Sequence, residues 1–330
     1  MKYKALVIGA GSIGALKPDE FDSPESKQIY THAHACYSHP NIDLVGIVDH
    51  DMDKAEQAAN KWNTTAYGSI NEFKYDPDLD IFPDIVIVAT NTNTHYDIIH
   101  QLIPYKPKVI ICEKPFCSNL EQAHNISELC KDAGINLIVN YTRTFVPELK
   151  ELSNDLKDGK YGEIYNFTLR YSRGLMREAC HAFYWCLQTF GPNIFDLMEY
   201  TKIYDSPTEG DYSSCKIMTS DICRNIAFLP VGFDTVIPLG KAYSTYNADI
   251  YTEKGRIELL NNWKTIRYHE NVKSTYGDYK ATGLLFEDKQ TQLDQALTFL
   301  LDHAIFSMNI DLPVDTYALD VHKHLKLNTG

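Results

Sequence analysis

Residues 3–14 read YKALVIGAGSIG, an apolar run that passes directly into three spaced glycines. An apolar run of this length suits a strand buried on both faces of a parallel sheet. Glycines at this spacing predict a dinucleotide-binding turn: the first permits the turn, the second lets a diphosphate approach the backbone, and the third lets a helix pack closely. We expect the cofactor to be contacted by the glycines and the residues between them: Gly9, Gly11, Ser12, Ile13 and Gly14.

The pattern around this motif continues through about the first 140 residues, where short apolar runs alternate with helix-period segments. Runs rich in Val, Ile and Leu that are separated by helices are typical of a doubly wound α/β domain. The expected strands are residues 3–8, 44–48, 85–89, 109–112 and 137–139, with helices at about 52–61, 95–103 and 119–132.

The pattern changes after about residue 143, where strand-like and often alternating segments are joined by turn residues. Such segments are typical of an antiparallel sheet. The sequence therefore predicts an α/β chain of two domains. Residues 1–143 are expected to form a Rossmann domain with a doubly wound parallel sheet. Residues 144–330 are expected to form an α+β domain with an open, mainly antiparallel sheet.

Composition excludes some classes of partner. The 330 residues carry a formal net charge of −13, whereas extended nucleic-acid surfaces need clustered Lys and Arg. The N-terminal apolar run reaches the glycines too soon for a signal peptide, and no later run approaches the ~18 apolar residues of a membrane span. We therefore expect a cytoplasmic protein that binds neither nucleic acid nor membrane.

Eight cysteines are scattered through the chain without a C-x-x-C pair. Several lie in apolar runs, where a thiol packs like a small hydrophobic side chain. Since zinc ligands usually recur at short spacings, we interpret these cysteines as reduced and mostly structural, and we expect no metal site.

The predicted second strand ends in VGIVD, which places Asp49 at its tip. A carboxylate at this position can accept hydrogen bonds from both adenosine ribose hydroxyls, and it repels a 2′-phosphate. No Arg follows Asp49 to pair with such a phosphate. Asp49 therefore predicts NAD as the cofactor, with NADP less favoured.

A polar stretch, residues 15–30, separates the glycine turn from the next helical pattern. Thr31 has the character of an N-cap for a helix over residues 31–39. A loop thus interrupts the usual passage from turn to helix. Long loops in compact domains are often functional or disordered, so the stretch is either a flap over the cofactor or a solvated insertion.

Polar residues also follow the predicted fourth and fifth strands, in the runs ATNTNTH (89–95) and CEKP (112–115). Open α/β sheets place ligands at the carboxyl ends of their strands. Pro115 ends the fifth strand and leaves the ammonium of Lys114 available at the sheet edge. The further cofactor contacts expected there are Thr90, Asn91, Asn93, His95, Glu113 and Lys114.

The glycine motif, the NTN turn with His95 and the E-K-P motif occur in the order found in the Gfo/Idh/MocA family, which the chain resembles. This family contains glucose-fructose oxidoreductase, inositol dehydrogenases and nucleotide-sugar dehydrogenases. The similarity extends into the second half, to residues 140–145 (NYTRTF), 159–164 (GKYGEI) and 251–257 (YTEKGRI). The resemblance implies a substrate-binding second domain and a homo-oligomer built through the open sheet.

The resemblance also implies two catalytic residues. The Lys of the family's E-K-P motif, matched by Lys114, holds the reacting hydroxyl or carbonyl, and a His of the second domain exchanges its proton. Aligning YSRG, residues 171–174, with polysaccharide-biosynthesis members places His181 at that position. An imidazole suits this role because its unperturbed pKa is close to neutral.

The match around His181 departs from the family pattern. Arg177 and Tyr184 stand where the family often has Asp, four residues before and three residues after the His. This leaves the proton route and the substrate open. An alternative register would place Asn193 at the His position, whereas the His181 register also aligns Gly191 and the downstream strands.

Several arginines lie near these landmarks in an otherwise acidic chain. Arginine offers bidentate hydrogen bonds to phosphate or carboxylate groups, so at least one of these arginines either binds an anionic part of the substrate or, like most surface arginines, is solvated. The aromatic residues nearby, Tyr171, Tyr184 and Trp185, are either a wall for a sugar ring or, as is commoner, part of the core. The candidate substrate-binding residues are Arg143, Arg173, Arg177 and Tyr184.

Together these observations predict an NAD(P)-dependent oxidoreductase that transfers a hydride between nicotinamide and a sugar or nucleotide-sugar alcohol or ketone, as in polysaccharide biosynthesis. The departures at Arg177 and Tyr184 motivate one alternative, a catalytically inactive member that binds the cofactor as a sensor or assembly partner. A methyltransferase that uses the glycine motif for S-adenosylmethionine is a second alternative, which the E-K-P motif disfavours.

Overall fold

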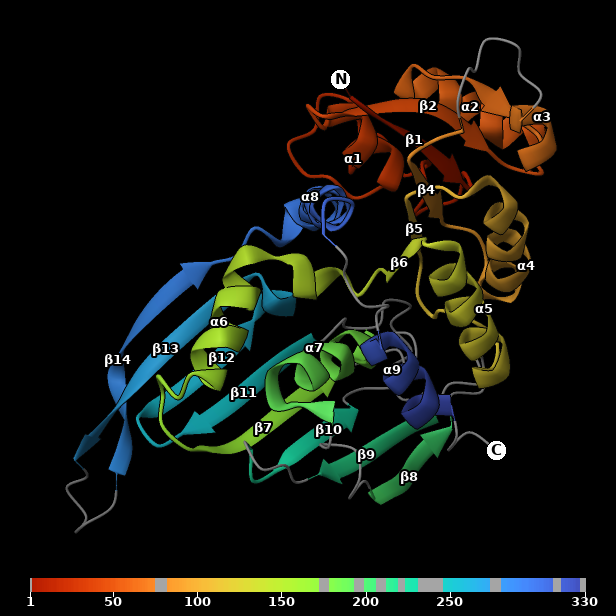
Figure 1. The fold of residues 1–330 in the computed structure, drawn as a ribbon. Helices are drawn as coiled ribbons and strands as arrows, with labels where there is room; N and C mark the ends of the chain where they lie inside the picture. Colours follow the sequence, from red (N-terminus) through yellow and green to blue (C-terminus); the bar gives the residue numbers. More distant parts are fainter. Residues whose placement is uncertain are drawn as a thin grey trace. The chain divides into compact units, whose positions relative to one another are not determined.

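A computed structural model of the chain describes residues 2–74, 82–171, 178–192, 199–205, 212–218, 223–230, 246–273, 280–310 and 316–326. The chain divides into two compact units, each built around its own sheet (Figure 1). The N-terminal unit comprises Met1–Phe145 and Asp294–His322, and the C-terminal unit comprises Val146–Leu293 and Lys323–Gly330. The segment Asp294–His322 thus belongs to the same unit as the N-terminal part of the sequence.

The sheet of the N-terminal unit has six strands in the order β3-β2-β1-β4-β5-β6, and every described pairing in it is parallel. This arrangement confirms the predicted Rossmann sheet. The strand order reverses between β1 and β4, where open α/β sheets bind their ligands. The strands are β1 Tyr3–Ile8, β2 Ile42–Val48, β3 Ala66–Tyr67, β4 Ile85–Val88, β5 Val109–Cys112 and β6 Asn136–Val139.

Helices connect these strands along the chain. Those of the first segment are α1 His32–Ser38, α2 Met52–Trp62, α3 Ile70–Lys74, α4 Thr92–Leu102, η1 Ile103–Tyr105, α5 Leu120–Ala133 and η2 Thr142–Phe145. The returning segment supplies η6 Leu293–Gln295 and α8 Ala296–Ser307, and α9 Thr316–Lys326 straddles the division between the units.

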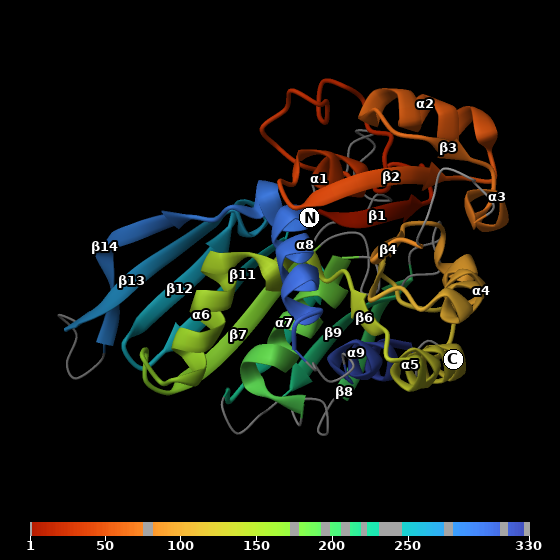
Figure 2. The ribbon, with the colours of Figure 1, turned by 45° about the horizontal axis from the view of Figure 1, so that its top comes forward.

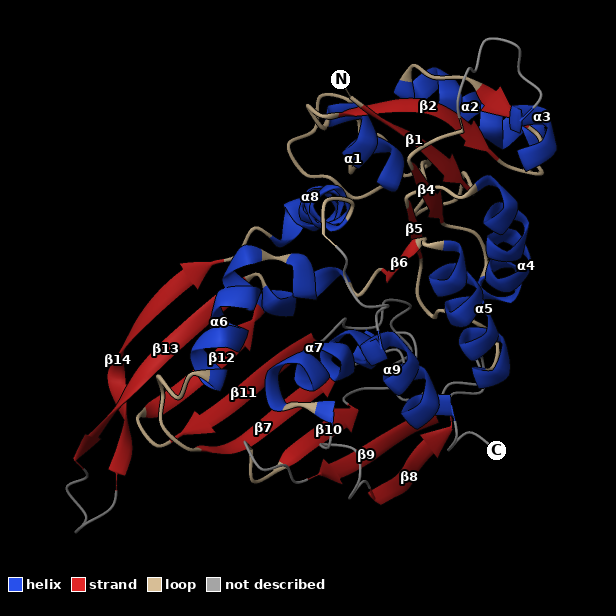
Figure 3. Ribbon diagram, in the orientation of Figure 1, coloured by secondary structure: helices blue, strands red, loops and turns tan. Residues whose placement is uncertain are grey.

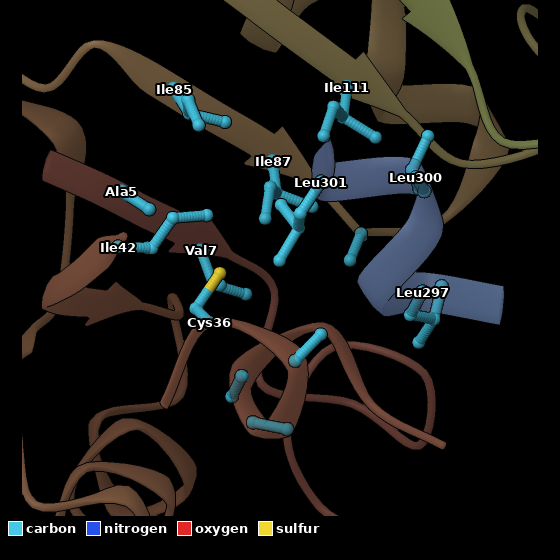
Figure 4. Packing of buried hydrophobic residues seen from close by; sticks show 14 of the residues in the cluster. Ala5, Val7, Cys36, Ile42, Ile85, Ile87, Ile111, Leu297, Leu300 and Leu301 are labelled. Carbon is cyan, nitrogen blue, oxygen red and sulfur yellow. The ribbon is translucent and has the colours of Figure 1, made fainter. Parts of the chain in front are cut away.

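Helix α8 completes the hydrophobic core of the N-terminal unit. Its buried Leu297, Leu300 and Leu301 belong to the same cluster as Val7 of β1 and Ile87 of β4. Figure 4 shows Leu301 next to Ile87 of β4, and Cys36 of α1 next to Val7 of β1. A face of the parallel sheet is therefore covered by residues from both ends of the sequence.

The sheet of the C-terminal unit has eight strands in the order β14-β13-β12-β11-β7-β10-β9-β8. Its described pairings are antiparallel except for β7 with β10, so the predicted, mainly antiparallel sheet is confirmed. The strands are β7 Ile164–Tyr171, β8 Glu199–Asp205, β9 Tyr212–Met218, β10 Ile226–Pro230, β11 Tyr246–Thr252, β12 Gly255–Leu260, β13 Thr265–Lys273 and β14 Lys280–Gln290.

Two helices, α6 Pro147–Lys157 and α7 Cys180–Phe190, lie over one face of this sheet in both views (Figures 2 and 3). The indole of Trp185 donates a hydrogen bond to the carbonyl oxygen of Leu149 at 3.2 Å, which ties α7 to α6. The 3-10 helix η5 Asn261–Trp263 joins β12 to β13.

Candidate functional site

The glycine turn after β1 is packed at its first and third glycines and open at its second. Gly9 has φ +104°, and a Cβ there would lie 2.7 Å from the carbonyl oxygen of Ala89. A Cβ on Gly14 would lie 1.8 Å from the carbonyl oxygen of Gly9, whereas a Cβ on Gly11 would meet nothing within 4 Å. Ser12 is exposed and Ile13 is half-buried. The turn therefore fits a dinucleotide, because the backbone at Gly11 is open to a diphosphate.

The helix that follows this turn is split and then resumes. Ala15 donates its backbone N–H to Gly11 O at 2.9 Å, which closes one turn. After residues 17–31, His32 N donates to Ile13 O at 3.0 Å and Ala33 N donates to Gly14 O at 2.8 Å. In a continuous helix these carbonyls would be used by the residues four positions later. Helix α1 therefore continues the hydrogen-bonding pattern of the first turn, with the inserted residues looped out.

The inserted segment is anchored by a buried carboxylate, Asp22. Tyr30 N donates to its Oδ1 at 3.0 Å, Thr31 Oγ1 donates to its Oδ2 at 2.6 Å, and His34 Nδ1 lies 2.7 Å from Oδ1. Burial alone would raise the pKa of Asp22, but the hydrogen bonds from His34, Thr31 and Tyr30 outweigh it and lower the pKa. Thr31 is the N-cap of α1, as its sequence context predicted.

The described contacts of this segment lie within the N-terminal unit. Lys61, in the last turn of α2, donates to Lys17 O at 2.8 Å and lies 2.7 Å from a carboxylate oxygen of Asp19. Ile29 N donates to Asp294 O at 2.9 Å. The segment thus joins α2 to Asp294 in the returning part of the chain. Because its Asp22 is buried, the segment is not solvated along its whole length.

Asp49 lies directly after β2 and faces the glycine turn. Its Oδ2 accepts the backbone N–H of Ala10 at 2.7 Å, and its Oδ1 accepts that of Asp51 at 3.0 Å. The imidazole of the exposed His50 lies 3.1 Å from Oδ1. The carboxylate is therefore fixed beside the turn, where a ribose would be recognised.

The segment after β4 forms the start of α4. Asn91 is the N-cap, and Thr94 Oγ1 donates to Thr90 Oγ1 at 2.8 Å. His95 is 1% exposed: its Nε2 lies 3.0 Å from Thr90 O and its Nδ1 lies 3.1 Å from Phe116 O. His95 thus joins the end of β4 to the loop after the E-K-P motif.

Asn91 and Asn93 are exposed, and Thr90 is half-buried. These three residues lie where a ligand at the sheet edge can reach them, whereas the ring of His95 is directed to backbone oxygens. Cofactor contact by any of the four stays a prediction.

The E-K-P motif begins directly after β5, and its Glu113 is buried. Glu113 Oε1 accepts Nδ2 of Asn140 at 2.6 Å and lies 2.8 Å from Nε2 of His32. Its Oε2 accepts the backbone N–H of Lys114 at 3.2 Å. Burial alone would raise the pKa of Glu113, but His32, Asn140 and the charge of Lys114 lower it overall. Lys114 is half-buried, and its peptide bond to Pro115 is cis.

The residues predicted for the substrate side are divided between the units. Arg143 lies in η2 of the N-terminal unit, whereas His181 and Tyr184 lie in α7 of the C-terminal unit, where they are 8% and 4% exposed. Arg173, Arg177 and Asn193 lie outside the described residues. The catalytic role of His181 and the substrate roles of the arginines and Tyr184 stay predictions.

Two residues of the site escaped the sequence analysis. His32 lies eighteen positions beyond Gly14 because of the inserted segment, and Asn140 was noted only as part of a landmark. The signal that could have found His32 is helical phase: it occupies the position that residue 17 would have in an unbroken helix.

The described residues include no helix long and apolar enough to cross a membrane. Among the same residues, no group of three or more His, Cys, Asp or Glu side chains could hold a metal ion. The seven cysteines whose side chains are described are free and buried, as their apolar surroundings predicted.

Residues 3–141 match the model of the GFO_IDH_MocA family, described as "Oxidoreductase family, NAD-binding Rossmann fold". Inositol 2-dehydrogenase of Rhizobium meliloti is 27% identical over 173 residues, which cover 51% of this chain and 45% of that protein. The aligned segments span 26%, 45% and 41% of the lengths of three curated relatives.

Solved structures share the fold over nearly the whole chain. An oxidoreductase from Agrobacterium radiobacter in complex with NAD⁺, L-tartaric acid and magnesium has a TM-score of 0.70 at 15% identity, covering 99% of this chain and 95% of that chain. A 3-ketoreductase from Actinomadura kijaniata in complex with NADP has a TM-score of 0.70 at 13% identity, covering 99% and 96%.

Proposed function

Because the chain belongs to the Gfo/Idh/MocA oxidoreductase family, we propose that it is an NAD(P)-dependent dehydrogenase or reductase acting on a CH–OH group of a sugar-like substrate. One observation carries the proposal: the open glycine turn, Asp49 and the E-K-P motif all lie at the carboxyl edge of the same parallel sheet. This edge combines the means to bind a dinucleotide with a lysine able to serve a reacting oxygen.

The bound dinucleotide would supply a hydride acceptor or donor at its nicotinamide ring. The turn from Gly9 to Gly14 would hold the diphosphate through backbone N–H groups, and Asp49 would accept the ribose hydroxyls. Backbone N–H groups of Ala10 and Asp51 hold this carboxylate in place beside the turn.

NAD is the expected cofactor. Structural neighbours contain NAD⁺ or NADP, so the preference rests on this chain's own residues. The carboxylate of Asp49 would repel a 2′-phosphate, and the residue that follows it is an exposed His rather than an Arg.

Lys114 would donate a hydrogen bond to the substrate oxygen and stabilise the negative charge that develops as the hydroxyl is oxidised. His181 would accept the proton of the substrate hydroxyl during oxidation, or return a proton to the substrate oxygen during reduction. The role of His181 rests on the family resemblance alone.

A polyol, a sugar or a nucleotide-linked sugar is the expected substrate, in line with the names of the relatives, which include inositol dehydrogenases and a 3-ketoreductase. A place in polysaccharide biosynthesis rests on the run YSRG and the arginines near it. We expect a homo-oligomer formed through the sheet of the C-terminal unit.

The test is a screen of myo-inositol, D-glucose and UDP-glucose with NAD⁺, followed by the absorbance of reduced nicotinamide. Turnover of at least one of the three is expected. If calorimetry shows that NAD⁺ binds but none of the three is oxidised, and the corresponding ketones are not reduced by NADH, the non-catalytic cofactor-binding alternative is favoured. Failure to bind either dinucleotide would contradict both.

A further inference from the structure

Glu113 is held by side chains from two elements outside its own motif. His32 comes from the first turn of the resumed helix α1 and is 0% exposed, and Asn140 follows β6 and is 1% exposed. Both reach the same carboxylate oxygen, Oε1, at 2.8 and 2.6 Å. The other oxygen accepts the backbone N–H of Lys114. The cluster of His32, Glu113 and Asn140, here called the glutamate clamp, thus fixes one carboxylate oxygen, and the backbone of Lys114 holds the other.

A buried carboxylate is costly unless its oxygens are satisfied, and here three donors surround it. The charge of Lys114 contributes to the lowered pKa of Glu113, so the two groups interact electrostatically as well as through the backbone. A change in the orientation of Glu113 therefore alters both the backbone at Lys114 and the field that acts on its ammonium.

Two atoms of the clamp are unpaired within the part of the chain that the structure describes. Among those residues, the buried atoms His32 Nδ1 and Asn140 Oδ1 have no hydrogen-bond partner. Buried polar groups are usually paired, and apolar side chains would fill the same space without this cost. A polar cluster that keeps two unpaired atoms beside the reactive lysine is poorly explained by packing alone.

We propose that His32 and Asn140 are positioning residues, which fix Glu113 so that the adjoining Lys114 is held in one orientation at the sheet edge. The proposal rests on the proposed function of Lys114.

Helix α1 provides a matched control for His32. His34 is also buried, and it pairs with a buried carboxylate, Asp22, at 2.7 Å. Its partner belongs to the inserted segment and not to the E-K-P motif. Replacing either His by Leu removes one buried His–carboxylate pair from the same helix, so both variants should lose stability.

The experiment compares His32→Leu, His32→Gln, Asn140→Leu and His34→Leu, using whichever of myo-inositol, D-glucose or UDP-glucose the wild type oxidises fastest. His32→Leu and Asn140→Leu should lower kcat by about tenfold or more, because small misplacements of a reacting group have effects of this size. The Kd for NADH should change little. His32→Gln keeps an N–H donor and should recover most of the rate, and His34→Leu should keep the kcat of the wild type.

A second readout needs no substrate. Lys114 can be labelled with pyridoxal 5′-phosphate and borohydride, and its labelling can be compared with that of Lys131 by peptide mass spectrometry. The ratio should change in His32→Leu and Asn140→Leu, return toward that of the wild type in His32→Gln, and stay unchanged in His34→Leu. This readout remains available if His32→Leu does not fold, because Asn140→Leu and His32→Gln test the same clamp.

Two kinds of failure are distinguishable. If Lys114→Ala lowers turnover but the clamp variants keep both the kcat and the labelling ratio of the wild type, the positioning role is wrong and the proposed function stands. If Lys114→Ala leaves turnover unchanged, the function of Lys114 is wrong. Equal losses of kcat in His34→Leu and His32→Leu would show that the clamp acts only through stability.

Discussion

The Asp49 carboxylate holds the backbone of the glycine turn, and its proposed second role is to recognise the ribose of the cofactor. Asp49→Asn keeps an acceptor oxygen but removes the charge. It should lower the preference for NAD over NADP by roughly tenfold, equivalent to about 1.4 kcal/mol, because the like-charge repulsion of a 2′-phosphate is lost. Calorimetric Kd values for both dinucleotides would measure this ratio.

Asp51, two residues later, is the control for Asp49. It is the N-cap of α2 and accepts Lys54 N at 3.4 Å. Asp51→Asn should leave the ratio of the two Kd values unchanged. An unchanged ratio in Asp49→Asn as well would remove Asp49 from cofactor discrimination.

Lys114→Ala tests the proposed role of this lysine at the reacting oxygen. The side chain is half-buried at the sheet edge, so its loss should leave the fold and the Kd for NADH nearly intact. Turnover of the substrate found in the screen should fall by about 10² to 10³-fold if the ammonium provides one preorganised electrostatic contact. Lys131→Ala, in the last turn of α5, serves as the control and should keep the rate of the wild type.

At the scale of elements, the buried Asp22 ties the inserted segment to the start of α1. Asp22→Asn should lower the free energy of unfolding by about 2 to 4 kcal/mol near neutral pH, since it breaks a buried, hydrogen-bonded carboxylate cluster. Denaturant unfolding followed by circular dichroism would measure the change. Asp19→Asn, which removes a largely exposed partner of Lys61, should cost less than about 1 kcal/mol.

The difference in free energy of unfolding between the wild type and Asp22→Asn should depend on pH with a defined sign. The folded-state pKa of Asp22 lies below its ordinary value. Its contribution to stability is therefore complete above the unfolded-state pKa and is lost as pH falls through the lower folded value. The stability difference between wild type and Asp22→Asn should shrink in that acidic range, and a difference that grows there would contradict the assigned charge state.

The regular elements were the most predictable part of the fold. Long apolar runs identified β1, β4, β5 and β6, because strands buried on both faces carry a strong signal. The two-residue strand β3 and the short α3 were not expected, since two and five residues are too few to show a period. The positions of glycine and proline in the sequence located the turn at Gly9 and the end of the strand before Lys114. The clamp around Glu113 could not be located in this way, because its side chains are brought together only by folding.

For the molecule as a whole, the N-terminal unit is completed by a helix from the far end of the sequence. Leu300 of α8 is fully buried in the cluster of Figure 4. Leu300→Ala should lower the free energy of unfolding of this unit by about 2 to 5 kcal/mol through lost burial and a cavity. Hydrogen exchange of β1 and β4 would report the loss locally.

Phe306 of the same helix is the control, because it is 58% exposed. Phe306→Ala should leave the exchange of both strands close to that of the wild type. Protection that is insensitive to Leu300→Ala would mean that α8 does not support the sheet.

The return of α8 could not be predicted from the sequence. The expected boundary near residue 143 treated the rest of the chain as one domain, and the apolar residues of α8 fit a core in either unit equally well. Hydrophobic patterning shows that a helix buries a face, but it does not show which sheet that face covers.

The resumed hydrogen bonding of α1 has a consequence for the length of the chain. The phase of this helix is set by the carbonyls of Ile13 and Gly14. His32 and Ala33 donate to these carbonyls, as the two residues directly after Leu16 would in an unbroken helix. A chain spliced from Leu16 to His32 should therefore form one continuous helix and still bind NADH, as circular dichroism and calorimetry would detect. The same junction could host foreign sequence of arbitrary length, because what is inserted there need not preserve the helical repeat.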